Sequence, residues 1–184
     1  MKVEGEREFT APRQTVWEVL NDPTRLAKTM PGVESFDVAD DKHWKANLKV
    51  PLGPGGLKMS VNFEKTEERE LEFAKLHAKG NGVGAIMNMD TAFHLSDSGG
   101  GTHMRWEADV HILGPIASMG QRVLQPIVNQ QVSNVLAALD VQVQEAAGTS
   151  APDGSSGAEE GLSPLAPESY SADPAGPTTS TEGS

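Results

Sequence analysis

The segment from Gly114 to Gln144 constrains the fold of this chain more than any other. It opens with Gly114-Pro115, which ends the preceding element and provides a favourable first turn for a helix. From there apolar residues return every three or four positions, which predicts a helix with one wide apolar stripe. About thirty helical residues form a rod of about 45 Å, and we expect Pro126 to kink it. No other segment predicts a second long helix, so the stripe must pack against a sheet.

Most of the chain before this helix alternates between apolar and polar residues, which is typical of strands with one face in the core. One strand is predicted at 2–9, two short helices at 10–20 and 24–29, and six further strands between 33 and 112, separated by turns. The prediction is an α+β protein in which a seven-stranded antiparallel sheet curls around the long C-terminal helix. This order of elements resembles the helix-grip fold of the START/Bet v 1 superfamily, also called SRPBCC.

The composition changes at about residue 146. From there to Ser184 the chain consists mainly of glycine, proline, serine, threonine and alanine with scattered acids. Such a segment buries too little apolar surface to offset the entropy lost on ordering. We therefore predict a folded ligand-binding domain over residues 1–145 and a disordered acidic tail over 146–184.

Charge and cysteine content exclude several classes of function. The chain has a formal net charge of −11, and all 15 basic but only 19 of the 26 acidic residues precede residue 145. No basic face stands out, so we expect no nucleic-acid partner. The absence of cysteine excludes disulfides and thiol catalysis. No apolar run suits a transmembrane helix or a signal peptide, so we expect a soluble cytoplasmic protein.

Two separated motifs are specific enough to indicate a family. The first runs Phe9-Thr-Ala-Pro-Arg-Gln-Thr-Val-Trp-Glu-Val-Leu-Asn-Asp-Pro-Thr-Arg-Leu and continues with Met30-Pro-Gly-Val-Glu. The second combines Gly101-Thr, Trp106 and Gly114-Pro-Ile-Ala-Ser-Met-Gly-Gln-Arg. In this order the two motifs resemble the CoxG family of carbon monoxide dehydrogenase proteins. The resemblance covers residues 2 to about 144, with one departure at Val135-Leu136, where relatives often carry aromatic residues.

The resemblance implies a non-enzymatic accessory protein that is encoded with molybdenum hydroxylases and couples such a dehydrogenase to the membrane. The wider superfamily binds lipids, sterols and polyketides between its sheet and its long helix. The implied partners are therefore molybdenum hydroxylase subunits of the carbon monoxide dehydrogenase type, an apolar ligand such as a quinone or another lipid, and, as a peripheral contact, the inner face of the cell membrane. No tightly bound cofactor is implied.

The predicted inward faces are almost entirely apolar and rich in methionine, whose flexible side chain adapts to a ligand of irregular shape. The alternative is that these residues fill an ordinary core. We expect the entrance to a cavity near the two short helices and the loop at 51–56, because moving them breaks few backbone hydrogen bonds. The predicted cavity lining consists of Trp17, Phe36, Trp44, Leu48, Met59, Val61, Phe63, Met87, Met89, Phe93, Met104, Trp106, Ala108, Met119, Val123 and Ile127.

The polar residues offer little chemistry. The five histidines fall mostly on outward faces, and His103 and His111 stand about 26 Å apart along one strand, too far to share a metal ion. No serine lies in a nucleophile elbow, and no glycine-rich loop carries the lysine of a phosphate loop. We therefore predict no metal site and no catalytic residue. Arg7 is the one inward-facing charge; Asp37, Glu34 or a ligand oxygen could pair with it, or it lies at the rim.

Three functions remain open at this point. The first is a carrier of an apolar redox lipid, in particular a quinone, that serves a molybdenum hydroxylase at the membrane. The second is an enzyme of the polyketide cyclase or dehydratase kind, which needs an acid–base pair inside the cavity. The third is a docking module without a cavity. The inward residues offer no acid–base pair, so the carrier is favoured.

Deleting the tail from Ala146 onward should leave the melting temperature nearly unchanged, because no hydrophobic burial is lost. Thermal unfolding of the shortened chain, followed by circular dichroism, checks this prediction. A fall of several degrees would mean that part of the segment packs on the domain.

Overall fold

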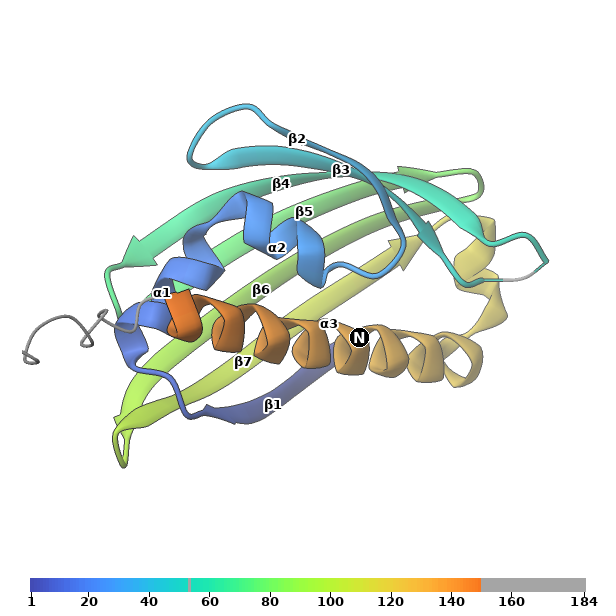
Figure 1. Ribbon diagram of the computed structural model, residues 1–184. Helices are drawn as coiled ribbons and strands as arrows, with labels where there is room; N and C mark the ends of the chain where they lie inside the picture. Colours follow the sequence, from blue (N-terminus) through green and yellow to red (C-terminus); the bar gives the residue numbers. More distant parts are fainter. Residues whose placement is uncertain (53, 150–184) are drawn as a thin grey trace, which may run out of the picture. The chain divides into compact units, whose positions relative to one another are not determined.

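Seven strands form one antiparallel sheet in the computed structural model, which describes residues 1–52 and 54–149 (Figure 1). They follow the order β1-β7-β6-β5-β4-β3-β2, so consecutive strands are neighbours except that β1 pairs with β7. The predicted disorder of the tail concerns residues that, from 150 on, lie outside the described part. The strands are β1 (Lys2–Phe9), β2 (Val33–Val38), β3 (His43–Val50), β4 (Leu57–Arg69), β5 (Phe73–Gly82), β6 (Ala85–Ser98) and β7 (Gly101–Leu113).

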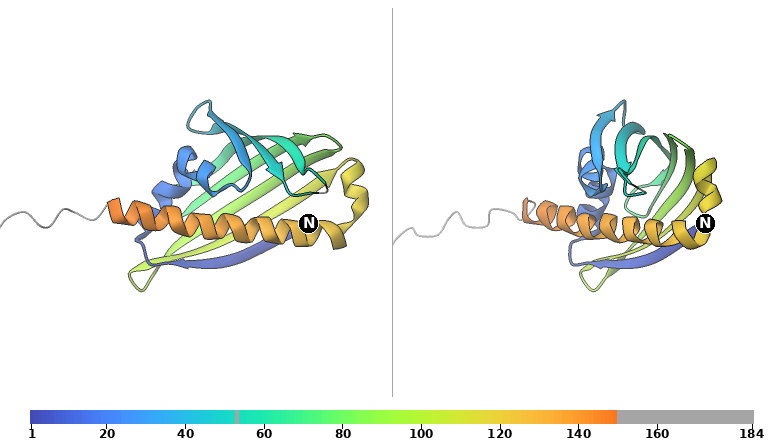
Figure 2. Two further views of the ribbon diagram at one scale, coloured as in Figure 1. Left: turned by 45° about the vertical axis from the view of Figure 1, so that its right-hand side comes forward. Right: turned by 90° about the vertical axis from the view of Figure 1, so that its right-hand side faces the viewer.

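The sheet curls, and the longest helix lies along its open side (Figure 2). Two short helices follow β1, and a 3-10 helix joins β7 to the long helix. This arrangement confirms the predicted α+β helix-grip architecture. The helices are α1 (Arg13–Asn21), α2 (Pro23–Thr29), the 3-10 helix η1 (Pro115–Met119) and α3 (Gln121–Thr149).

The residue pair Asp22-Pro23 separates α1 from α2. The Asp22 carboxylate accepts hydrogen bonds from the backbone N–H of Thr24 at 2.8 Å and of Arg25 at 3.3 Å. These bonds cap the otherwise unpaired donors of the first turn of α2, and Pro23 suits that turn because it has no N–H to satisfy. The chain therefore changes direction here and places two short helices, instead of one long one, beside the sheet.

The fifth strand is more regular than its sequence pattern indicated. In the sequence, alternation begins at Leu71 and is lost near His77, which predicts a short, irregular strand. In the structure Leu71 lies in the preceding turn with φ +63°, and β5 continues to Gly82. Alternation is hard to recognise here because the inward positions hold alanine and glycine instead of large apolar residues. The strand is thus uninterrupted, and mainly small side chains cover its inner surface.

The long helix begins later and ends later than predicted. The segment after Gly114 forms η1, and Gly120, with φ +76°, interrupts the chain before α3 starts at Gln121. The expected helix start at Pro115 is therefore wrong, and Pro126 lies in the second turn of α3 instead of its middle. At the other end α3 continues to Thr149, and Ala146 is buried. The folded region extends past the predicted boundary at residue 145.

The main hydrophobic core ties the C-terminal half of α3 to the short helices and the sheet. It contains α1 residues such as Trp17, sheet residues such as Trp106, and Leu139 and Val143 of α3. At its edge, the guanidinium of Arg7 on β1 binds both carboxylate oxygens of Asp140 on α3, with Nε and Oδ1 at 3.2 Å. The partner of Arg7 is thus Asp140, not Asp37 or Glu34, and the ion pair lies at the rim of the core.

Because α3 continues to Thr149, the structure changes the expectation for deletion from Ala146 onward. Truncation after Glu145 should lower the melting temperature, whereas truncation after Thr149 should not. The shorter chain loses Ala146, which is buried, and Ala147, which packs against the same core. At about 0.8 kcal/mol per buried carbon, the loss is about 1 kcal/mol or slightly more, or roughly 2–4 °C for a domain of this size. Differential scanning calorimetry of the two truncated chains makes the comparison, and equal melting temperatures would contradict it.

Candidate ligand-binding site

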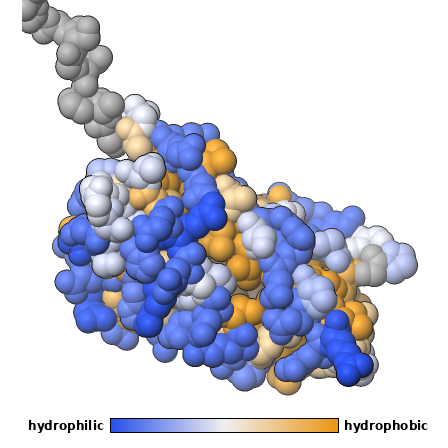
Figure 3. All heavy atoms as spheres, turned by 90° about the horizontal axis from the view of Figure 1, so that it is seen from below, coloured by the Kyte–Doolittle hydropathy of each residue, from blue (hydrophilic) through white to orange (hydrophobic). Residues whose placement is uncertain are grey.

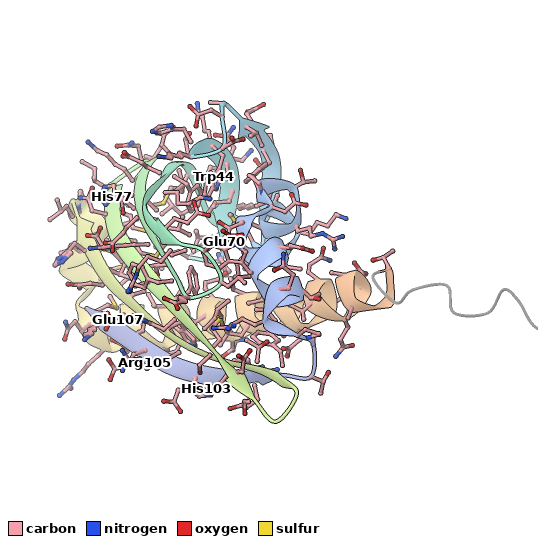
Figure 4. All side chains as sticks on the ribbon, turned by 90° about the vertical axis from the view of Figure 1, so that its left-hand side faces the viewer. Trp44, Glu70, His77, His103, Arg105 and Glu107 are labelled. Carbon is pink, nitrogen blue, oxygen red and sulfur yellow. The ribbon has the colours of Figure 1, made fainter. Side chains whose placement is uncertain are left out.

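Strand register identifies the inner face of the sheet. Directly paired residues of an antiparallel sheet lie on the same face. Trp44 pairs with Phe63, Phe63 with Ala78, Ala78 with Met89, and Met89 with Val110. Trp44, Ala78 and Val110 are buried, so this row lies on the concave side, and Figure 4 shows Trp44 inside the curl of the sheet.

Small residues occupy the middle of this inner face. On β5 the inward positions include Ala78, Gly80 and Gly82, which pair across to β4 and β6. A Cβ atom on Gly80 would lie only 2.6 Å from Sδ of Met59 and 3.3 Å from Cε of Met87. The methionines of the neighbouring strands therefore lie over the backbone of β5, and their flexible side chains form a surface that can change shape.

The inner face divides into two hydrophobic clusters, and only one of them includes α3. The first is the core around Trp17, Leu139 and Val143. The second, which we call the apolar wall, contains no α3 residue within the described chain. In the N-terminal half of α3, Leu124 is buried but belongs to neither cluster. The apolar wall consists of Met59, Val61, Ala78 and Ala85, with Leu48, Leu57, Phe63, Met87, Met89 and Ile116 packed against them.

The predicted lining residues fall into three groups. Those in the core are buried: Trp17, Trp44, Met59, Val61, Met104, Trp106 and Ala108. A second group is partly buried, although the sheet residues among them point inward: Phe36, Leu48, Phe63, Met87, Met89, Phe93 and Ile127. Fourteen of the sixteen thus lie in or beside the interior, which is compatible with either an ordinary core or a lining.

Met119 and Val123 depart from the prediction. Their exposed fractions are 44% and 43%, so neither belongs to a buried lining. Helical spacing placed Met119 on the apolar stripe, but Gly120 breaks the helix and that spacing does not apply to η1. Val123 lies in the first turn of α3. Both side chains form part of the outer surface at this end.

Two buried indole groups place polar N–H donors in this interior. Trp44 and Trp106 are exposed by only 4% and 9% of their surface. Within the described residues, neither indole N–H has a hydrogen-bond acceptor. A buried donor without an acceptor is costly, so two such donors are suited to a ligand that brings acceptor oxygens. Sequence patterns gave no signal for this, because a tryptophan on an apolar face indicates only a core position.

The outer surface has two open depressions. The first, of about 520 Å³, adjoins the β4–β5 turn and is lined by Trp17, Lys42, Lys65, Thr66, Glu67, Glu68 and Glu70. Polar surface predominates in it. The second, of about 670 Å³, lies over β2 to β5 and is lined by Asp37, Val38, Ala39, His43, Trp44, Lys45, Asn62, Phe63, Glu64, His77 and Lys79. Its exposed lining is mainly apolar, but it is open to solvent and bordered by seven polar or charged side chains, so the inner face remains the candidate site.

The histidines that Figure 4 labels lie on the outer side of the sheet. His77 Nδ1 is 3.0 Å from Asp90, and His103 Nδ1 is 2.5 Å from Glu8, both across neighbouring strands. In residues 1–52 and 54–149, no three histidine or carboxylate side chains are grouped to hold a metal ion. No described helix has the length and apolarity needed to span a membrane.

Comparison with known sequences decides the family. Residues 5–144 match the sequence family described as CoxG of carbon monoxide dehydrogenase. The chain belongs to the CoxG family. Comparison with curated proteins gives no match. CoxG proteins are accessory components and generally non-catalytic, and membership implies association with carbon monoxide dehydrogenase.

Solved structures support the fold of this CoxG family member. A conserved protein from Geobacillus kaustophilus superposes with a TM-score of 0.73 at 21% identity, covering 79% of this chain and 97% of the other. A START superfamily protein from Mycobacterium smegmatis gives 0.60 at 12%, covering 78% and 97%. The protein Ara h 8.0201 gives 0.59 at 15%, covering 79% and 98%. At these identities the similarity establishes the START/Bet v 1-like fold alone.

Replacing Gly5 by alanine should destabilise the protein through Trp106. A Cβ atom at this position of β1 would lie 2.8 Å from Cζ2 of the Trp106 indole, a rigid ring that cannot bend away. Overpacking of this kind costs about 1–3 kcal/mol. Gly148→Ala is the matched control, since a Cβ there meets nothing within 4 Å. Urea denaturation of both variants checks the difference; equal stability would mean that the ring moves freely.

Proposed function

We propose that this CoxG family member binds a quinone between its sheet and α3 and thereby couples a molybdenum hydroxylase of the carbon monoxide dehydrogenase type to the membrane. The observation that carries the proposal is the apolar wall, which α3 crosses without joining its hydrophobic cluster. An apolar surface left partly exposed inside a fold is costly unless something covers it. A ligand that is largely hydrocarbon would supply that cover.

The two buried indole donors favour a quinone over a plain hydrocarbon. A quinone combines an apolar ring and isoprenoid tail with carbonyl oxygens that accept hydrogen bonds. Trp44 on β3 and Trp106 on β7 belong to the core beside the wall, and either indole would donate to one such oxygen. Methionines of the wall such as Met59, Met87 and Met89 would adapt to the ring and tail. The interior thus matches both halves of the molecule.

The coupling role rests on family membership. The dehydrogenase oxidises its substrate and releases electrons, and a quinone takes up two electrons and two protons to leave as the quinol. In this scheme the protein forms or breaks no covalent bond, which agrees with an accessory role. Its part is to hold an otherwise insoluble redox molecule near the enzyme.

Replacing Ala108 by tryptophan should fill the interior and abolish quinone binding. Ala108 is buried on β7 and shares its face with Val3 and Thr91. Ala137→Trp on the exposed side of α3 is the matched control. Binding of decylubiquinone, measured by equilibrium dialysis, should be lost in the first variant and retained in the second.

The same pair of variants tests the coupling. With Ala108→Trp, electron transfer from the dehydrogenase to membrane quinone should fall, although the dehydrogenase should still reduce an artificial acceptor. Thr91→Phe, at a partly buried position beside Ala108, replaces Ala108→Trp if that variant does not fold. Normal quinone binding and electron transfer in a folded, filled variant would overturn the carrier and leave a docking module without a ligand.

The indole donors are tested by Trp44→Phe and Trp106→Phe. Each removes one N–H while keeping an aromatic ring, and loss of one neutral hydrogen bond weakens binding by up to about tenfold. Decylubiquinone affinity should fall accordingly, whereas the affinity for dodecylbenzene, which lacks oxygen, should not. Equal effects on both molecules would mean that the rings contribute by shape alone.

A further inference from the structure

One end of the sheet is built from three connecting segments that carry no charge. These are residues 50–52 and 54–57 between β3 and β4, 80–87 at the β5–β6 turn, and 112–121 from the end of β7 through η1. Register brings them together, because Val50 pairs with Leu57, Met59 with Gly82, and Ile86 with Leu113. We call this the η1 end; in Figure 1 it lies at the right.

Large apolar side chains are exposed at this end. The structure describes seven exposed large hydrophobic residues, of which four belong to the η1 end: Val83, Ile86, Leu113 and Met119. A fifth, Val123, follows directly in the first turn of α3. The segments that carry these residues are neighbours in space, since the N–H of Ile116 in η1 donates to the carbonyl of Gly84 in the β5–β6 turn at 3.1 Å. Val83, at the tip of the β5–β6 turn, is 89% exposed. Figure 3 shows hydrophobic side chains gathered at the right-hand end of the molecule.

The charges that border this patch are mainly basic. The nearest charged residues along the chain are Lys49 and Lys58 on either side of the first segment, Lys79 before the second, and Arg122 after the third. One acid lies close to them, because Glu34 is 3.5 Å from Lys58 Nζ. The next acids, Asp90 and Asp109, lie further along their strands, where Asp90 faces His77 and Asp109 faces the N-terminal amine and His111.

The opposite end of the sheet is acidic. Its turns join β2 to β3, β4 to β5 and β6 to β7. They and the adjoining strand ends hold seven acids, Asp40, Asp41, Glu67, Glu68, Glu70, Glu72 and Asp97, against three bases, Lys42, Lys65 and Arg69, so this end has a net negative charge. Although the whole chain is acidic, its charge is therefore arranged along the strands, from an acidic end to an apolar end with a basic border.

We infer that the η1 end is a docking surface for an anionic lipid bilayer. Exposed apolar residues at loop tips enter the boundary between headgroups and acyl chains, while lysine and arginine around them meet the lipid phosphates. The carboxylates at the other end of the sheet repel an anionic bilayer, so only one orientation is favourable. The inference deepens the proposed function, since the apolar wall begins at this end: Leu57, Ala85 and Ile116 belong to it.

This orientation sets the path of the ligand. A quinone leaving the bilayer would enter at this end, where Leu57 and Ile116 belong to the apolar wall, and would meet the wall without crossing water. The sequence indicates an entrance near the two short helices and the loop at 51–56; of these, the loop belongs to the same end of the sheet.

Vesicle sedimentation with the full chain tests the surface. The probes are vesicles of phosphatidylcholine alone and of phosphatidylcholine with one third phosphatidylglycerol. We expect binding to the anionic vesicles that weakens with salt. The double variant Val83→Asp/Met119→Asp should reduce that binding by roughly tenfold or more, because both residues lose their apolar contact with the bilayer. Lys49→Glu/Arg122→Glu should weaken binding to anionic vesicles only.

Matched control variants change exposed residues outside the η1 end. The remaining two exposed large hydrophobics, Val38 and Val141, lie on β2 and on the second half of α3. Val38→Asp/Val141→Asp should bind vesicles like the wild type, as should Lys42→Glu in the acidic β2–β3 turn. All of these residues are exposed, so circular dichroism melting should show that every variant folds.

Three outcomes overturn the inference. The inference is wrong if the wild-type protein binds neither kind of vesicle. It is also wrong if Val83→Asp/Met119→Asp binds anionic vesicles as well as the wild type does. If that variant instead loses contact with the dehydrogenase, or changes from dimer to monomer in light scattering, while vesicle binding persists, the patch is a protein interface. Decylubiquinone dialysis without vesicles separates the two proposals, because the η1-end variants should still take up the free quinone.

Discussion

The structure depends on how α3 is held above the sheet. Its C-terminal half is fixed by the hydrophobic core with α1 and the sheet, and by the ion pair between Asp140 and Arg7 of β1. Its N-terminal half is connected to the sheet through η1 and contributes nothing to the apolar wall beneath it among the described residues. The two halves of the helix thus differ in their packing: the C-terminal half is part of the main core, and the N-terminal half lies where we propose that the ligand binds.

Much of the fold could be predicted from the sequence because it follows from periodicity. Alternation along β7 and the three-to-four spacing along α3 are strong signals, since each extends over more than ten residues. The errors have local causes. A glycine at residue 120 with positive φ divides what the spacing predicts as one helix, and small inward residues on β5 hide its alternation. Helix propensity alone also could not predict that α3 continues to Thr149, because this extension depends on the packing of Ala146 into the core.

The candidate site was predictable in its apolar residues but not in its polarity. Most of the proposed lining lies in or beside the interior, because inward positions follow from strand alternation. The missing acceptors of Trp44 and Trp106 depend on tertiary neighbours, and so does the partner of Arg7, which lies 133 positions away in sequence. The separation of charge between the two ends likewise emerges only when register assigns each turn to an end.

Glycines on both sides of η1 have a consequence for how this connection can vary. Gly114 and Gly120 have φ values of +94° and +76°, so backbone direction changes on either side of a five-residue segment. In a continuous helix each inserted residue turns the following side chains by about 100°. Here the two glycines can absorb such a rotation, so the link between sheet and helix can lengthen or shorten while the same stripe of α3 stays turned inward.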